Sequence, residues 1–335
     1  MLGEKYNHHQ RDLNQVFIDY EKAFDRVWHA ALSETIKKYI GKNLIKVIEQ
    51  LYANTSSAVL INGSLGNWFR TKVGVRQGCL LSPTLFNIFL EKIMTEALKN
   101  HTGTISINGR NITNLRFADD IVGLAGNEQE LENLIIEMDS ASRKHKMEIS
   151  GEKTKMMTNN PAGIQQEIKV NNQGLETVSK FKYLGSIISD EGSKPEILSR
   201  IAQTMEALSR LKPLWRNNNL SIATKVRLLR ALVLSIFTYA CETWTLTAEL
   251  ERKIQALEMR CFRLILNIKY TDHITNNTVK KRIFNHIGRY EELLGIIKRR
   301  KLQWYGHITR SNGLSKTILQ GTVEGSRPRG RPKKS

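Results

Sequence analysis

The spacing of apolar positions divides the chain into a first part of mixed strands and helices and a second part made of helices. Short or alternating apolar runs predict strands in 14–19, 56–62, 68–73, 104–107, 112–124 and 167–189. Apolar positions recurring every three or four residues predict helices over 22–39, 43–53, 83–100 and 128–147. Past residue 192 the predicted elements are helices, over 195–212, 221–240 and 248–267. The predicted fold class is therefore α+β.

Turn signals join several of the strands. Asn62-Gly63 and Asn108-Gly109 each follow a strand pattern, and this dipeptide favours a two-residue hairpin turn. Residues 1–12 are polar, and we expect them to fray. Hairpins are therefore the main connection expected in the first part of the chain.

Basic residues concentrate in the second part of the chain. Residues 1–195 hold 24 basic and 22 acidic residues, whereas 196–335 hold 27 and 10. This contrast indicates that the first part carries out a reaction and that the second part binds a polyanion. Nucleic acid is the favoured polyanion and an anionic membrane is the alternative. No run of about 18 uncharged apolar residues predicts a membrane-spanning helix.

The cysteines indicate the compartment. Cys79, Cys241 and Cys261 form no Cys-x-x-Cys pair, and an odd number argues against a disulfide framework. The N-terminal residues do not resemble a signal peptide. We therefore expect an intracellular protein, in the nucleus or the cytoplasm, and not a secreted one. No pattern indicates an oligomeric state.

Two adjacent carboxylates, Asp119 and Asp120, stand between apolar runs in 115–124. Ala118 is small and Gly123 is permissive, so the segment is expected to form a strand, a tight turn and a second strand. Neighbouring acids are costly unless a cation neutralises them, and Mg²⁺ prefers carboxylate ligands. The alternative is a solvated surface turn.

Two further segments carry candidate chemistry. An apolar run in 16–18 leads into Asp19, as in a buried strand that ends on an acid. Such an acid can meet a hairpin-tip pair across a sheet. The segment 74–87 combines a glycine-rich loop with Ser82-Pro83, which opens a helical pattern.

These three segments, in this order, resemble the palm of a reverse transcriptase. They are most similar to the non-LTR (LINE-type) retrotransposon endonuclease–reverse transcriptases. Residues 17–25 match that family's F-x-D-x-x-K-A-F-D pattern, 74–87 its G-x-R-Q-G-x-x-x-S-P-x-L-F-N pattern and 117–120 its F/Y-A-D-D box. Residues 153–155 match its lysine-bearing K-T segment, and 181–185 its F-x-Y-L-G primer-grip hairpin. Family members often have Asn about three residues before that lysine, where this chain has Ser150.

The resemblance implies RNA-directed DNA polymerisation by two metal ions, Mg²⁺ or alternatively Mn²⁺. It implies an RNA template, a DNA primer and deoxynucleoside triphosphates as partners, with no role for a membrane. Asp19 and Asp119 are the implied ligands of both ions, Asp120 is a weaker third acid, and the carbonyl of Ile18 is an extra ligand. A purely structural turn acid is the alternative for Asp120.

The resemblance also implies nucleotide and primer contacts. Phe24 would floor the incoming sugar, Gln77 and Gly78 would lie close to the nucleotide, and Lys153 would meet its phosphates. Phe24 could instead be helix packing, and Lys153 a surface lysine. The expected primer grip is the set Phe181, Lys182, Tyr183, Leu184 and Gly185, although the aromatic residues in it could be sheet core.

The resemblance divides the chain into a palm over 1–192, a helical thumb over 193–270 and a basic region with a disordered tail over 271–335. The palm it implies is an antiparallel sheet with packed helices. An upstream fingers region and an endonuclease are expected to be largely missing, which makes a fragment the leading interpretation. A catalytically silent, nucleic-acid-binding remnant is the alternative. The tail residues Arg329, Gly330, Arg331 and Pro332 resemble the core of an AT-hook, or a generic basic or nuclear-import segment.

Overall fold

The computed structural model describes residues 1–324, which form two compact units. Lys5–Phe181 with 323–324 form one, which we call the sheet unit, and Met1–Glu4 with Lys182–Thr322 form the other, which we call the helical unit. Each unit has its own apolar core. No helix within 1–324 is both long and apolar enough to cross a membrane. The AT-hook-like segment, 329–332, lies outside the described residues.

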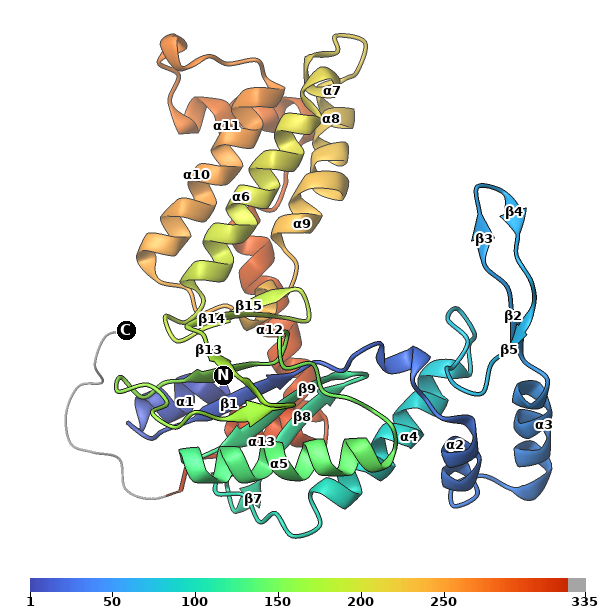
Figure 1. Ribbon diagram of the computed structural model, residues 1–335. Helices are drawn as coiled ribbons and strands as arrows, with labels where there is room; N and C mark the ends of the chain where they lie inside the picture. Colours follow the sequence, from blue (N-terminus) through green and yellow to red (C-terminus); the bar gives the residue numbers. More distant parts are fainter. Residues whose placement is uncertain (325–335) are drawn as a thin grey trace. The chain divides into compact units, whose positions relative to one another are not determined.

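A five-stranded sheet forms the centre of the sheet unit (Figure 1). Its strand order is β13-β10-β1-β9-β8, with bounds β1 Asn14–Ile18, β8 Asn114–Phe117, β9 Asp120–Ala125, β10 Lys155–Thr158 and β13 Glu176–Thr177. β1 is the middle strand and pairs antiparallel with β10 and β9. The predicted antiparallel sheet is confirmed for four strands, whereas β13 pairs with β10 in the parallel direction.

Two long helices build the core of this unit with the sheet. α5 (Glu128–Lys144) lies against β1 and β9, and α4 (Ser82–Ala97) packs against α5. The apolar stripe expected from the spacing faces inward, because Leu131, Leu134, Ile135 and Met138 are at most 1% exposed. Burial of each such side chain contributes about 1.5–3 kcal/mol, so this stripe fixes α5 on the sheet.

Short hairpins have the backbone that Asn-Gly predicts. Asn62 and Gly63 have φ angles of 49° and 81° between β3 (Leu60–Ile61) and β4 (Ser64–Leu65). Asn108 and Gly109 have φ angles of 53° and 73° between β6 (Ser106–Ile107) and β7 (Arg110–Asn111). Positive φ at both central residues is the mark of the favoured hairpin turn. Two further pairs are β2 (Ser56–Ser57) with β5 (Phe69–Arg70) and β11 (Lys169–Val170) with β12 (Gln173–Gly174).

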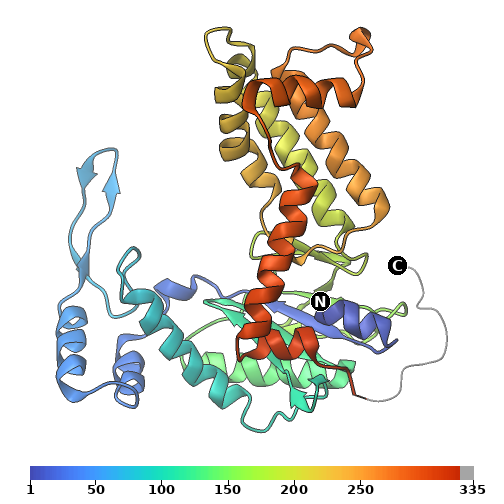
Figure 2. The same ribbon diagram turned by 180° about the vertical axis from the view of Figure 1, so that it is seen from behind.

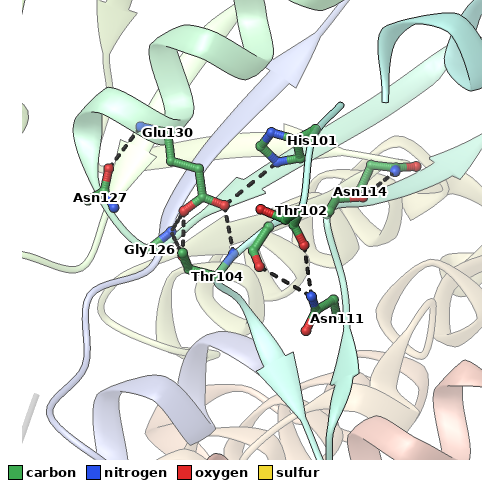
Figure 3. Close-up of polar contacts among 10 residues, drawn as sticks. His101, Thr102, Thr104, Asn111, Asn114, Gly126, Asn127 and Glu130 are labelled. Carbon is green, nitrogen blue, oxygen red and sulfur yellow. Dashed lines mark hydrogen bonds and ion pairs between the residues drawn. The ribbon is translucent and has the colours of Figure 1, made fainter. Parts of the chain in front are cut away.

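Glu130, in the first turn of α5, ties the end of β9 to the segment before β6 (Figure 3). Its carboxylate accepts hydrogen bonds from the backbone N–H of Gly126 at 2.9 Å and of Thr104 at 2.8 Å. Asn127 caps the helix, since its Oδ1 accepts from the Glu130 N–H at 2.8 Å. His101 Nε2 lies 3.6 Å from the same carboxylate. These bonds fix one end of β9, and the other end carries Asp120.

The single helix predicted over 22–39 is wrong. Lys22 has a φ of 48°, the 3₁₀ turn η1 (Ala23–Asp25) follows, and α2 (His29–Ile36) begins later. The Val75 N–H donates to the Phe24 carbonyl and the Gly74 N–H to the Val27 carbonyl, each at 2.8 Å. The carbonyl groups of Phe24 and Val27 therefore accept hydrogen bonds from the glycine loop and not from the next turn of a helix, as the local apolar spacing had predicted. The next expected helix is confirmed as α3 (Lys42–Ala53).

The N-terminal residues are ordered, contrary to the expectation that they fray. Leu2–His8 form α1, and Tyr6 is buried. The Tyr6 hydroxyl accepts from the Ser106 N–H at 3.0 Å and donates to the Ser106 carbonyl at 3.2 Å. One aromatic side chain therefore anchors an otherwise polar segment.

The helical unit includes most of the hairpin of β14 (Lys180–Tyr183) and β15 (Ser186–Ser189), and its helices follow that hairpin in the chain (Figures 1 and 2). Its longest helices are α6 (Lys194–Arg210), α10 (Ala248–Ile265), α11 (Asn276–Ile287) and α12 (Leu293–Arg310). The helix predicted over 221–240 is interrupted, because α8 (Ile222–Leu228) passes into the π-helical turn η2 (Leu229–Leu234) before α9 (Ser235–Phe237). Shorter elements are α7 (Lys212–Arg216), η3 (Cys241–Thr243), η4 (Tyr270–Asp272) and α13 (Leu314–Gln320). The predicted basic helical part is confirmed.

Candidate active site

The sheet register brings the end of β1 to the tip of the β8–β9 hairpin. Ile18, the last residue of β1, is opposite Ile121 of β9, and Asp19 follows directly. Asp119 lies in the hairpin turn, and Asp120 opens β9 opposite Phe117. The preceding turn residue, Ala118, has a φ of 53°, which is uncommon for a residue with a side chain. Three acids from distant parts of the sequence therefore meet at one edge of the sheet, as expected.

The charges of the three acids act on one another. The pKa of the Asp120 carboxyl is raised above its usual value, first by burial and then by the negative charges of Asp119 and Asp19. Such charge effects require neighbouring carboxylates. A cation at this edge would offset the repulsion, because an opposite charge favours the ionised form.

A turn over 150–154 fixes the backbone of Asp19. The Asp19 N–H donates to Thr154 Oγ1 at 3.3 Å, and the Asp19 carbonyl accepts from the Ser150 N–H at 2.9 Å. Lys153 leaves the same turn, with its Nζ 3.6 Å from Asp19 Oδ1. This ion pair is largely solvated and contributes little to stability. The ion pair instead determines position: Lys153, the lysine expected to contact phosphates, lies beside Asp19, an expected metal ligand.

The glycine loop, 74–78, is hydrogen-bonded to the segment that carries Phe24. The Phe24 ring stacks on Phe86 of α4 with the ring centroids 4.4 Å apart, so it has the packing contact that the sequence left open. Gly74 has a φ of 92°, and a Cβ there would lie 3.2 Å from the Asp25 carbonyl oxygen, so the close approach requires glycine. Gln77 and Gly78 are exposed farther along the loop.

Comparison with known proteins identifies the family to which this acidic edge belongs. Residues 3–188 match the family described as reverse transcriptase (RNA-dependent DNA polymerase). The chain belongs to the reverse transcriptase family. The match includes the three acids, the glycine loop and the expected primer-grip residues.

Curated relatives of this reverse transcriptase come from transposable elements. A transposon-derived protein of Caenorhabditis elegans is 29% identical over 211 residues, which cover 61% of this chain and 74% of the relative. The Pol polyprotein of retrotransposable element R2 from Nasonia vitripennis is 28% identical over 187 residues, covering 52% and 18%. The RNA-directed DNA polymerase from mobile element jockey of Drosophila melanogaster is 23% identical over 259 residues, covering 74% and 28%. The LINE-type resemblance is confirmed, and the matched part is less than a third of the R2 and jockey proteins.

Reverse transcriptases use divalent metal ions, and the acidic edge has suitable donors. Asp19, Asp119 and Asp120 supply carboxylate oxygens, which Mg²⁺ prefers, and their mutual repulsion favours a bound cation. Within residues 1–324, however, no three His, Cys, Asp or Glu side chains lie close enough together to hold one metal ion. The donor chemistry therefore fits a divalent ion, while the side chains do not enclose one in this conformation.

The expected primer-grip residues of the reverse transcriptase divide between the two units. Phe181 belongs to the sheet unit, and its ring stacks on Phe17 of β1 with the centroids 4.3 Å apart. Lys182 and Tyr183 complete β14 in the helical unit. Leu184 and Gly185 form the turn before β15, with φ angles of 48° and 77°. The expected hairpin is present, and its contact with a primer stays a prediction.

Sequence reasoning missed several residues that support these segments. Thr154 is 0% and Ser150 is 4% exposed, and both bond to the Asp19 backbone. Thr154 belongs to the K-T segment of the family, so a Thr between two lysines of that segment was an available signal. Arg200 and Tyr239, which bond to the 184–185 turn, had no such signal, because both lie outside the matched motifs.

Proposed function

We propose that this chain is the polymerase portion of a LINE-type reverse transcriptase, which extends a DNA primer along an RNA template from deoxynucleoside triphosphates. The observation that carries the proposal is the register that places Asp19 beside the Asp119–Asp120 hairpin tip. The family match over residues 3–188 supports the reaction class. We propose that the protein acts inside the cell, in the nucleus or the cytoplasm.

We assign Asp19 and Asp119 as the ligands of two Mg²⁺ ions, with the Ile18 carbonyl as an additional donor. When bound, such ions would activate the attacking 3′ hydroxyl and stabilise the leaving pyrophosphate. Asp120 adds negative charge to the same edge. Lys153 leaves the turn that fixes Asp19, and we assign it to the triphosphate.

The remaining assignments concern the nucleotide. Phe24, attached to the glycine loop, would contact the incoming sugar. Gln77 and Gly78 are exposed on that loop, and glycine permits close approach of backbone to a ligand. These residues would position the nucleotide, whereas the acids would bind the metal ions.

Primer extension on poly(rA)/oligo(dT) tests the proposal. Asp119→Asn keeps the side-chain shape and removes a charge, so we expect extension to fall by at least about 10²-fold, as for other losses of charge stabilisation. Asp12→Asn is a matched control, because Asp12 is an exposed acid just before β1. Equal extension by the parent and Asp119→Asn, or an equal loss in the control, would contradict the assignment.

Nucleic-acid binding without catalysis is the second candidate function. It is favoured by the 27 basic against 10 acidic residues in 196–335, and by the open arrangement of the three acids. Filter binding to an RNA–DNA hybrid at rising salt measures it, because phosphate contacts weaken steeply with salt. Salt-sensitive binding with no extension in Mg²⁺ or Mn²⁺ would support this candidate over the polymerase.

A further inference from the structure

The turn at Leu184 and Gly185 has both of its carbonyl groups bonded to side chains of the helical unit. The Tyr239 hydroxyl, just past α9, donates to the Leu184 carbonyl at 2.7 Å. The Arg200 guanidinium, from α6, donates through Nη2 to the Gly185 carbonyl. Two side chains from separate elements therefore fix the tip of one hairpin.

A buried ion pair holds the guanidinium in place. Glu196 is 3% and Arg200 is 7% exposed, and Arg200 Nε donates to Glu196 Oε1 at 2.6 Å. Glu196 Oε2 accepts from the Ile187 N–H of β15 at 2.7 Å. The pair thus bonds to the hairpin at two points, in its turn at Gly185 and in β15 at Ile187. Buried charges are tolerated when they are paired and hydrogen-bonded in this way.

Tyr239 contacts both the Arg200 guanidinium and the turn. The Arg200 guanidinium carbon lies 4.6 Å from the centre of the Tyr239 ring, within the range of a cation–π contact. A Cβ on Gly185 would lie 3.4 Å from the Tyr239 hydroxyl, so ring and turn are in close contact. The hydroxyl, the ring and the guanidinium are therefore fixed relative to one another and to the turn.

We infer that Glu196, Arg200 and Tyr239 are positioning residues that hold the 184–185 turn rigid, so that it can support the sugar-phosphate backbone at the primer 3′ end. The inference rests on the proposed function. None of the three residues needs to touch the reacting atoms. Their effect is on geometry, and a displacement of about 1 Å at a reacting end can cost about 10²-fold in rate.

Tyr239→Phe tests the inference, because it removes one hydrogen bond and leaves the ring in place. Tyr305→Phe is the matched control. The two tyrosines are 49% and 50% exposed, and the Tyr305 hydroxyl makes no hydrogen bond to the residues that the structure describes. Hydrogen exchange of peptides covering 182–189 measures the turn without requiring catalysis. We expect exchange there to rise at least threefold in Tyr239→Phe and to stay unchanged in the control.

Two further readouts follow the primer end. With 2-aminopurine as the primer's 3′ nucleotide in a bound RNA–DNA hybrid, Tyr239→Phe is expected to change the fluorescence. In extension, kcat is expected to fall about fivefold while KM for primer–template stays within twofold, because misplacement affects the reacting geometry more than phosphate binding. Arg200→Lys keeps the charge but lacks the guanidinium fork, so it should reproduce the increase in exchange.

The outcomes separate this inference from the proposed function. A parent that extends no primer, combined with a faster-exchanging turn and altered primer-end fluorescence in Tyr239→Phe, would overturn the polymerase and support the positioning role. Unchanged exchange in both variants would overturn the inference even if the parent is active. Faster exchange with unchanged fluorescence would also overturn it, since the turn would then be mobile without any consequence for the primer.

Discussion

Glu258 gives the helical unit a pH-dependent stability. It lies on α10, it is 3% exposed, and its Oε1 accepts a hydrogen bond from the Leu293 N–H at 2.8 Å, at the start of α12. Burial raises the pKa of its carboxyl from 4.5 to about 7, and the nearby charge of Glu292 adds to the rise. The Leu293 N–H and the charges of Lys280 and Arg230 oppose it.

The sign of the effect follows from where the proton resides. Between pH 4.5 and about 7 the folded protein keeps a proton on Glu258 that the unfolded chain releases, so the free energy of unfolding falls as pH rises. One pKa unit is worth about 1.4 kcal/mol. The full contribution, about 3 kcal/mol, is present below pH 4.5 and is lost above about pH 7.

Glu258→Gln removes this dependence while keeping an oxygen that can accept from the Leu293 N–H. We therefore expect the difference in unfolding free energy, variant minus parent, to rise by about 2–3 kcal/mol between pH 5 and pH 8. An unpaired amide group could lower the difference by about 1–3 kcal/mol at every pH, but it would not change the slope. Other titrating groups cancel in the difference.

Urea unfolding by tryptophan fluorescence measures this, provided that the signal comes from the helical unit. Trp28 and Trp68, the tryptophans of the sheet unit, are first replaced by Phe in every protein, so that Trp215, Trp244 and Trp304 of the helical unit report. Glu206→Gln, at an exposed ion pair on α6, is the control and should give a flat difference. A Glu258→Gln difference that varies by less than about 0.5 kcal/mol from pH 5 to pH 8 would refute the reasoning.

Three more predictions concern the sheet unit. Gly123→Ala is expected to cost about 1–3 kcal/mol in urea unfolding of protein that keeps the sheet-unit tryptophans, Trp28 and Trp68, because its Cβ would lie under 3.0 Å from side chains of β1 and α5. Gly41→Ala meets no atom within 4 Å and should cost little. Thr154→Val leaves the Asp19 N–H without its side-chain acceptor, so we expect a loss of about 1–3 kcal/mol in the same assay and slower primer extension. Phe24→Ala is expected to raise the ratio of ribonucleotide to deoxyribonucleotide incorporation, and an unchanged ratio would leave Phe24 with packing alone.

Sequence reasoning succeeded where short-range pattern determines structure. The two apolar runs in 115–124 and the small residue at Ala118 were sufficient to predict the hairpin and its two acids, and the run ending at Asp19 predicted the central strand. The apolar spacing of 128–147 likewise predicted α5, since one buried stripe holds that helix on the sheet. The domain boundaries and the roles of the site residues stay predictions.

Prediction from the sequence failed where hydrogen bonds join segments that are distant in the chain. The helix predicted to start at Lys22 gives way to η1 because Phe24 and Val27 bond to the glycine loop, and nothing within 22–39 signals that partner. The polar N-terminus is ordered through Tyr6 and Ser106, which are far apart in the sequence. Local periodicity contains no information about such pairs, so these errors are systematic.

Asp19, assigned to the metal ions, and the 184–185 turn, assigned to the primer, are held in place in the same way. Asp19 and the 184–185 turn both lie just beyond regular strand pairing, where backbone groups lose their ladder partners. In the first, Thr154 and the Ser150 N–H take up the N–H and the carbonyl of Asp19. In the second, side chains take up both carbonyls of the turn. An unpaired backbone group costs free energy and permits movement, so these partners determine how accurately the motif residues are placed. A chain that keeps the acids but loses such partners would retain the motifs and lose the geometry, and the rate of primer extension is therefore a better measure of an intact site than the motifs themselves.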